Sequence, residues 1–138
     1  MRVMMMVKGD REPGHLPSEE LLAQIGKYNE DLAKAGVLMD LSALHWSAQG
    51  VRVKYSRGDR TRVEGPFGEP KETVAGYWVL LVKSMDEAVE WAERFPFEAG
   101  GEPDFEGEVE IRQVFEMEEF GESSAIEQAL EPEKEPQH

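Results

Sequence analysis

The chain has 138 residues, which suits a single domain with a modest core, and it contains no cysteine, which excludes disulfide bonds, thiolate catalysis and zinc–thiolate sites. Its net charge is −14, and residues 116–138 carry −7 of it. Because nucleic-acid binding depends on basic side chains that release counterions, the sequence excludes nucleic acid as the main partner.

The chain begins with a short apolar stretch. Residues 2–7, within MRVMMMV, predict a first strand that is apolar on both of its faces. This stretch of seven residues is too short for a signal peptide or a membrane span, and Lys8 and Asp10 follow directly. We therefore expect a cytoplasmic protein with no membrane contact.

A helix is expected next. Ser18 suits the N-cap position, and Gly36 suits the residue just beyond the C-terminal end. The apolar positions between them fall on one side at helical spacing: Leu21, Leu22, Ile25, Tyr28, Leu32 and Ala35. A second strand is predicted over residues 37–44, and it leads to His45 and Trp46.

Residues 51–63 alternate apolar and basic side chains about a turn at Arg57-Gly58-Asp59, a pattern typical of a β-hairpin. We expect Val51, Val53 and Tyr55 to face inward, and the basic side chains to face outward: Arg52, Lys54, Arg60 and Arg62. The charges favour either contact with a small anion or an edge ribbon that resists aggregation.

The stretch from Glu64 to Lys83 holds a tight Gly-Pro turn and then the longest apolar run in the chain. Residues 73–83 predict a strand that is apolar on both faces. A second helix follows, and Ser84 and Glu87 have the spacing of a capping box. Its apolar side comprises Ala88, Val89, Trp91, Ala92 and Phe95, and Pro96 ends it. Residues 108–117 predict the last strand.

These elements predict an α+β domain over residues 1–120, with a ferredoxin-like split βαβ topology and an inserted hairpin. Residues 121–138 form an acidic C-terminal tail, in which residues 123–130 could make about two helical turns. Two helices can cover only one face of the sheet, yet the first and third long strands are apolar on both faces. We therefore expect a homodimer that covers the remaining face.

Several of the same residues carry a family resemblance. The ordered motifs are Glu64-Gly65-Pro66-Phe67, Glu69, Lys71-Glu72, Gly76-Tyr77, the helix from Asp86 to Ala92, Pro96 and residues 108–112. Together they resemble the DGPF-domain branch of the YCII-related proteins. The resemblance covers about residues 1–116 and implies a ferredoxin-like subunit that pairs into a dimeric α+β barrel. This chain departs from the pattern at Glu64, where the motif has Asp, and at Phe95.

Some YCII-related proteins act as lyases or dehalogenases on ring compounds, with a histidine in the first helix and an aspartate directly before the proline that follows the second helix. Here the first helix has no histidine, and Phe95 stands before Pro96. The resemblance therefore does not carry that acid–base pair to this chain.

Candidate site residues lie at strand ends and in the Gly-Pro loop. Glu64, Phe67 and Lys71 are candidate ligand-binding residues on a loop held by a scaffold, although such a turn also serves topology alone. His45 and Glu72 are candidate groups for proton transfer. Glu110 and Arg112 share one face of the last strand, and they predict either a polar pocket lining or a structural ion pair.

No metal or cofactor site is predicted. The histidines at positions 15, 45 and 138 lack metal-ligand spacing, and Gly100-Gly101 precedes residues that cannot form a phosphate-binding turn. Two functions stay open. The first is a homodimeric module that binds a small molecule or another protein; the second is a lyase or isomerase that moves a proton with His45 or a carboxylate.

Overall fold

The computed structural model describes residues 1–97, 107–121, 125, 128 and 129. Its strands and helices follow in the order β1 (Arg2–Lys8), α1 (Glu19–Lys34), β2 (Leu38–Ala43), β3 (Val51–Ser56), β4 (Asp59–Glu64), β5 (Val74–Leu81), α2 (Met85–Glu93) and β6 (Glu108–Gln113). Among the described residues, short 3-10 turns include η1 (Ser47–Gln49), η2 (Pro70–Glu72) and, after β6, η4 (Met117–Phe120).

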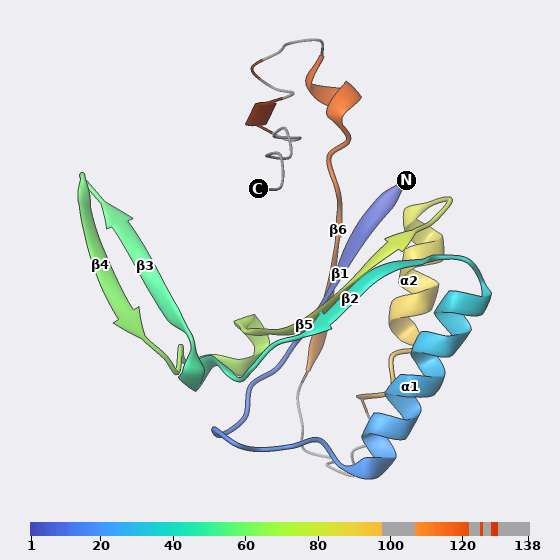
Figure 1. The fold of residues 1–138 in the computed structure, drawn as a ribbon, viewed down its shortest axis with the longest axis horizontal. Coiled ribbons are helices and arrows are strands. Elements are labelled where there is room, and N and C mark those ends of the chain that lie inside the picture. The colour runs from blue at the N-terminus through green and yellow to red at the C-terminus, as the bar shows by residue number, and fades with distance from the viewer. Residues whose placement is uncertain (98–106, 122–124, 126–127, 130–138) are drawn as a thin grey trace, which may run out of the picture.

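Four strands form one antiparallel sheet in the order β2-β5-β1-β6. With one helix after β1 and another after β5, this is the split βαβ, ferredoxin-like topology, so the predicted fold class is confirmed. Figure 1 shows α1 and α2 on the same side of the sheet, and the hairpin of β3 and β4 extending away from it. The hairpin is a separate two-stranded sheet.

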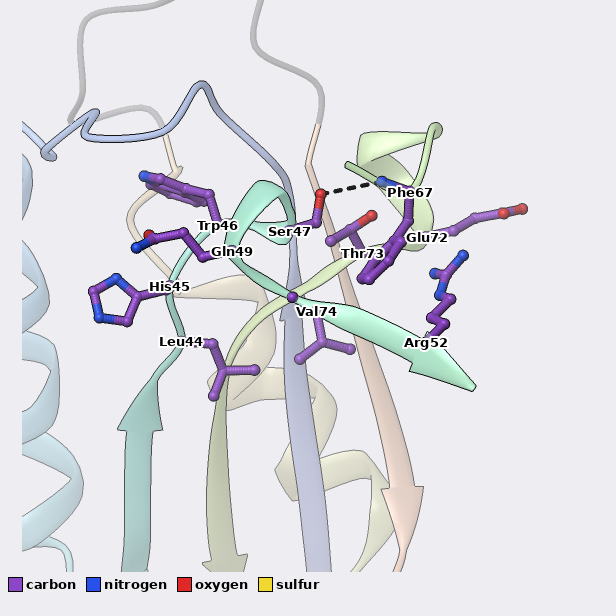
Figure 2. A pocket seen from close by; sticks show the side chains of 11 residues that line it. Leu44, His45, Trp46, Ser47, Gln49, Arg52, Phe67, Glu72, Thr73 and Val74 are labelled. Atoms are coloured by element: carbon purple, nitrogen blue, oxygen red, sulfur yellow. Dashed lines mark hydrogen bonds between the residues drawn. The ribbon is translucent and has the colours of Figure 1, made fainter. Parts of the chain in front are cut away.

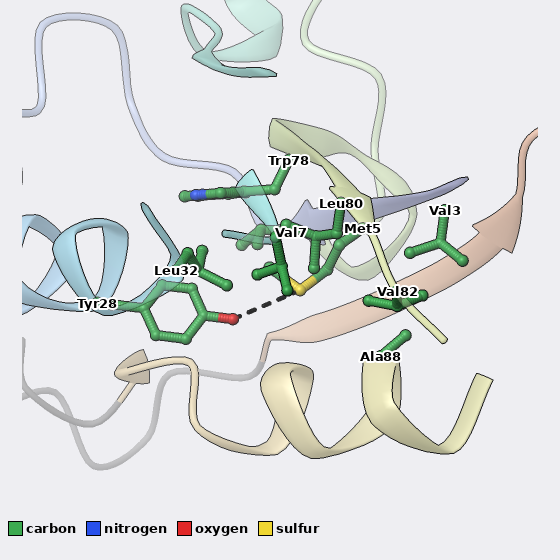
Figure 3. Packing of buried hydrophobic residues seen from close by; sticks show 10 residues of the cluster. Val3, Met5, Val7, Tyr28, Leu32, Trp78, Leu80, Val82 and Ala88 are labelled. Carbon is green, nitrogen blue, oxygen red and sulfur yellow. Dashed lines mark hydrogen bonds between the residues drawn. The ribbon is translucent and has the colours of Figure 1, made fainter. Parts of the chain in front are cut away.

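The core lies between the sheet and the two helices. Alternate residues of β1 and β5 point into it, and they meet side chains of both helices: Val3, Met5, Val7, Trp78, Leu80, Tyr28, Leu32 and Ala88 (Figure 3). The Tyr28 hydroxyl donates a hydrogen bond to the Trp91 carbonyl oxygen at 2.7 Å and lies 3.7 Å from the Met5 sulfur. This buried donor is satisfied, and burial raises the pKa of Tyr28.

The opposite face of the sheet has no helix over it within the described part of the chain. It carries the other side chains of the two central strands, which are partly exposed: Met4, Met6, Ala75, Tyr77, Val79 and Leu81. We call this surface the open face. The prediction that β1 and β5 are apolar on both sides is therefore confirmed.

The outer strand β2 contains an irregularity. Leu38 pairs with Leu80 and Asp40 pairs with Val79, so Met39 is an extra residue that bulges from the ladder. Asp40 therefore lies on the open face, whereas Leu41 returns to the core side opposite Trp78.

Both helices begin where their sequences predicted. The Ser18 hydroxyl accepts a hydrogen bond from the Leu21 amide, and the Ser84 hydroxyl accepts one from the Glu87 amide, each at 3.1 Å. The reciprocal half of the second cap differs from the prediction, because the Glu87 carboxylate accepts from the amide of Lys83.

Three apolar helix residues predicted for the core are exposed instead: Leu22, Ala35 and Val89. Leu22 and Val89 lie at the margins of their apolar stripes, and Ala35 is the C-cap at the end of α1. Residues 121–138 were expected to form an acidic tail, and most of them, including the proposed helical segment 123–130, lie outside the described residues. In the described part of the chain, no helix is long and apolar enough to cross a membrane.

The hairpin itself is confirmed, but the predicted assignment of its faces is wrong. Val53 pairs with Arg62 and Tyr55 pairs with Arg60, and paired residues of antiparallel strands share a face. Arg60 and Arg62 therefore lie beside the apolar side chains, not beside Arg52. None of the three apolar residues of β3 faces inward, because the hairpin projects from the domain and leaves them exposed.

Gly65, at the end of β4, lies against the backbone of the β2–β3 loop. Its amide donates to the Gly50 carbonyl oxygen at 2.9 Å, and a Cβ atom at position 65 would lie 1.7 Å from the Ser47 carbonyl oxygen. No side chain has room there. Glycine at this position lets the two loops touch.

We expect Gly65→Ala to lower the free energy of unfolding by about 2–3 kcal/mol, because the new methyl group must push two backbone segments apart. Urea denaturation measures the change. Gly26→Ala is the matched control: Gly26 is exposed inside α1 with open space around it, so alanine should raise stability by about 0.5–1 kcal/mol. Equal stability of Gly65→Ala and the parent would contradict the close contact.

Candidate functional site

Three loops meet around Ser47 at one end of the sheet. Strands β1 and β2 both run antiparallel to β5, so the loops that follow them leave the sheet at the same end of the strands. Asp10 follows β1, and its carboxylate accepts hydrogen bonds from the Ser47 amide at 3.0 Å and from the Ser47 hydroxyl. The Ser47 oxygen in turn accepts from the Phe67 amide at 3.3 Å.

The carboxylate of Asp10 is held in its charged form. Partial burial raises its pKa, but the hydrogen bonds from Ser47 and from the Arg11 amide outweigh burial, so the pKa of Asp10 is below its ordinary value. Ser47 is itself buried. This network fixes the positions of the β1–α1, β2–β3 and β4–β5 loops relative to one another.

A pocket with a volume of about 380 Å³ lies beside this network (Figure 2). The β2–β3 loop, the base of β3 and the approach to β5 contribute its walls. Its lining residues are Leu44, His45, Trp46, Ser47, Gln49, Gly50, Arg52, Phe67, Glu72, Thr73 and Val74. The structure thus brings His45, Phe67 and Glu72, three residues singled out from the sequence, into one lining.

His45 and Arg52 lie on opposite sides of the pocket in Figure 2, with Leu44 and Val74 between them. His45 is exposed, and among the described residues it has no hydrogen-bond or ion-pair partner. The neighbouring Trp46 is fixed, because its indole nitrogen donates to the His15 carbonyl oxygen at 2.7 Å.

Arg52 and Phe67 form the opposite wall. The guanidinium carbon of Arg52 lies 4.0 Å from the centroid of the Phe67 ring, within the range of a cation–π contact. Within the part of the chain that the structure describes, Arg52 makes no ion pair with a carboxylate. A flat cation supported on an aromatic ring is thus available to a ligand in the pocket.

Two further predicted residues of the Gly-Pro loop lie outside the lining. Glu64 is exposed at the end of β4 and accepts a hydrogen bond from Arg62 at 2.7 Å. Lys71 is an exposed residue of η2. Of the loop candidates, the pocket therefore combines Phe67 and Glu72 only.

Glu110 and Arg112 lie on the open face, opposite Met6 and Met4. Glu110 accepts hydrogen bonds from Lys8 at 2.5 Å and from Arg112 at 3.3 Å. The hydrogen bond from Lys8, followed by the one from Arg112, lowers the pKa of Glu110, and the same contact with Glu110 raises the pKa of Lys8. The side chain of Lys8 is only 15% exposed, so this group is a partly covered ionic cluster on the sheet.

Sequence reasoning missed Asp10 and Ser47, and did not connect Arg52 with Phe67. The missed signal was topological. The first and second strands of a split βαβ unit are parallel, so polar residues just after each strand meet at the same end of the sheet. Within the described residues, no three histidine or acidic side chains are grouped so as to hold a metal ion.

The Glu110 cluster generates a pH prediction. Because its pKa is lowered, Glu110 stabilises the fold at pH values above its ordinary pKa of 4.5, and that stabilisation is lost as the pH falls through the folded-state pKa. Because its pKa is raised, Lys8 stabilises the fold at pH values below its ordinary pKa of 10.5, and that stabilisation is lost as the pH rises through the folded-state pKa. The cluster therefore stabilises the fold between these limits.

We expect Glu110→Gln to lower the thermal midpoint near pH 7 and to match the parent well below pH 4.5, where the parent carboxylate is also neutral. Thermal melts from pH 2 to pH 9 measure the difference. Glu108→Gln, on the same strand, is the control and should show a smaller difference at every pH. A constant Glu110→Gln deficit at all pH values would argue against the ionic cluster.

Comparison with known sequences identifies the family. The model of the YCII-related domain matches residues 1–118. A curated relative, the uncharacterized protein R00369 of Rhizobium meliloti (strain 1021), is 26% identical over 74 residues, which are 54% of this chain. The match spans 60% of that relative, less than two thirds of its length.

Among solved structures, the chain is similar to the 5-chloro-2-hydroxyhydroquinone dehydrochlorinase TftG from Burkholderia phenoliruptrix AC1100, in complex with 2,5-dihydroxybenzoquinone. The TM-score is 0.40 and the identity 15%, over 83% of this chain and 94% of the other. A likeness this distant says nothing of the chemistry of this chain. The family model covers most of the sequence, and the chain belongs to the YCII-related domain family.

Proposed function

We propose that the protein is a homodimeric module that binds a small, flat carboxylate in the pocket between His45 and Arg52. The observation that carries this proposal is the guanidinium of Arg52, stacked on Phe67 in the pocket wall and without an ion pair among the described residues. Phe67 covers one face of the guanidinium, which leaves its N–H edge and its other face for a ligand.

The chemistry of the lining suggests the ligand class. A guanidinium edge binds a carboxylate through two parallel hydrogen bonds, which a lysine cannot reproduce. Leu44, Trp46 and Val74 supply apolar walls suited to a ring. Glu72 is an acceptor in the same lining, so a ligand hydroxyl would complement it. A hydroxy-substituted aromatic carboxylate combines all three features.

The enzymatic alternative, a lyase or isomerase, rests on His45 and Glu72 in the same pocket. A general base works best when another group orients it, and the described residues provide no such partner for His45. Ser47 is buried, and its hydroxyl already donates to Asp10 and accepts from the Phe67 amide. These contacts favour binding over catalysis.

The dimer is part of the proposal. The open face is apolar at its centre, and the helices cover only the opposite side of the sheet. A second copy placed face to face would bury the open faces of both subunits, in the manner of a dimeric α+β barrel. We assign residues 1–120 to this domain of the DGPF branch and residues 121–138 to a tail; the family match ends close by, at residue 118.

The binding proposal predicts that 4-hydroxybenzoate, used as the probe, shifts the indole N–H resonance of Trp46 in NMR titrations, whereas the neutral analogue 4-hydroxybenzamide binds at least about tenfold more weakly. Arg52→Gln should remove this preference, because it removes the charge. Arg60→Gln is the matched control, since Arg60 is a hairpin arginine outside the pocket lining. Equal affinity for acid and amide in the parent protein would overturn the proposal.

For the dimer, we expect sedimentation equilibrium to give twice the chain mass of 15.6 kDa. Leu81→Asp should weaken association by at least about tenfold, because it places a charge on the open face. Leu22→Asp is the control: Leu22 is 52% exposed on α1, and Leu81 is 48% exposed. A folded monomer at high protein concentration would contradict this part of the proposal.

A further inference from the structure

We infer that the hairpin of β3 and β4 is an arm that grips the body of a second copy of this chain. The hairpin forms its own two-stranded sheet, and its apolar residues Val51, Val53 and Tyr55 are 45%, 51% and 71% exposed. A two-stranded hairpin is at best marginally stable alone in water. An exposed apolar face on such a hairpin is expected to pack against another surface.

The two faces of the hairpin differ. One face is supported at its base, where Arg52 stacks on Phe67 and Val63 is half-buried. The other face carries the three apolar side chains of β3, with Arg60 over the Tyr55 ring at 5.1 Å. We call this second face the gripping face. It combines exposed apolar side chains with the positive charge of Arg60, while Arg62 on the same face pairs with Glu64 at 2.7 Å.

Charge indicates what the gripping face meets. Residues 51–64 contain five basic and two acidic side chains, a net charge of +3, whereas residues 1–50, 65–97 and 107–121 together carry −9. The body of a second copy is therefore opposite in net charge to the arm. Its open face also offers apolar surface, bordered by Asp40 on β2 and by the Lys8–Glu110–Arg112 cluster toward β6.

Dimensions and symmetry agree with this occupant. Six-residue strands give the arm a reach of roughly 20 Å, and a four-stranded sheet is roughly 14 Å wide between its outer strands. In each copy the arm points away from its own sheet (Figure 1), so a two-fold axis lets both arms reach the other body at once. The two open faces cover each other at their centres, and each arm then lies along the outer margin of the other copy's sheet.

This inference rests on the proposed dimer, and the test separates the two. The double variant Val53→Ser/Tyr55→Ser changes the gripping face, and Lys54→Ser/Thr61→Ser changes the opposite face as a control. By analytical ultracentrifugation, the dimer dissociation constant of the gripping-face variant should be at least about tenfold higher than that of the parent protein. The dissociation constant of the control variant should lie within about twofold of the parent value. Circular dichroism checks that both variants keep the fold.

Charge attraction gives a second readout. Raising the salt concentration from 50 mM to 500 mM should weaken the parent dimer several-fold, because it screens the attraction between arm and body. If the gripping-face variant dimerises as tightly as the parent protein, the arm is overturned and the dimer still stands. A monomeric parent protein would overturn both.

The absence of cysteine allows a direct test of contact. Tyr55→Cys, labelled with a photo-crosslinking maleimide, should crosslink in mixtures of isotopically heavy and light chains to residues of the other chain in the outer strands, β2 or β6. Lys54→Cys, on the opposite face, should do so far less. Crosslinks confined within single chains would also overturn the inference.

Discussion

The site depends on one partly buried contact, the pair of hydrogen bonds that the Asp10 carboxylate accepts from Ser47. Through the Ser47 amide and hydroxyl, it joins the loop after β1 to the loop after β2, and the hydroxyl oxygen also receives the Phe67 amide. Gly65 completes the arrangement by letting the third loop approach Ser47 without a side chain. The pocket walls are consequently set by polar contacts, whereas the domain is held together by its apolar core.

The apolar core is asymmetric, and this asymmetry shapes the rest of the molecule. Tyr28, Leu32 and Ala88 bring both helices to the same side of the sheet. The opposite side keeps Met4, Met6 and Val79 only partly covered, next to the Lys8–Glu110 pair. The hydrogen bond between these two side chains raises the pKa of Lys8 and lowers the pKa of Glu110.

The sequence was sufficient for the fold because local signals agreed with one another. The apolar run of β1, a serine cap on each helix and the turn at Gly58 all pointed to the elements that formed. The faces of the hairpin were assigned wrongly because alternation within one strand does not give the register with the next. The pocket was only partly anticipated, since Asp10 meets Ser47 and Arg52 meets Phe67 through loop packing, and loop packing has no periodic signature.

The bulge at Met39 bears on how copies of the chain can associate. An intact outer strand presents a continuous row of unpaired amide and carbonyl groups, which is a template for adding further chains without limit. In β2 the extra residue interrupts that row between Leu38 and Asp40 and twists the strand locally. The outer strand β2 is therefore a poor seed for fibril growth, even though the central strands of the sheet are rich in valine, leucine and methionine.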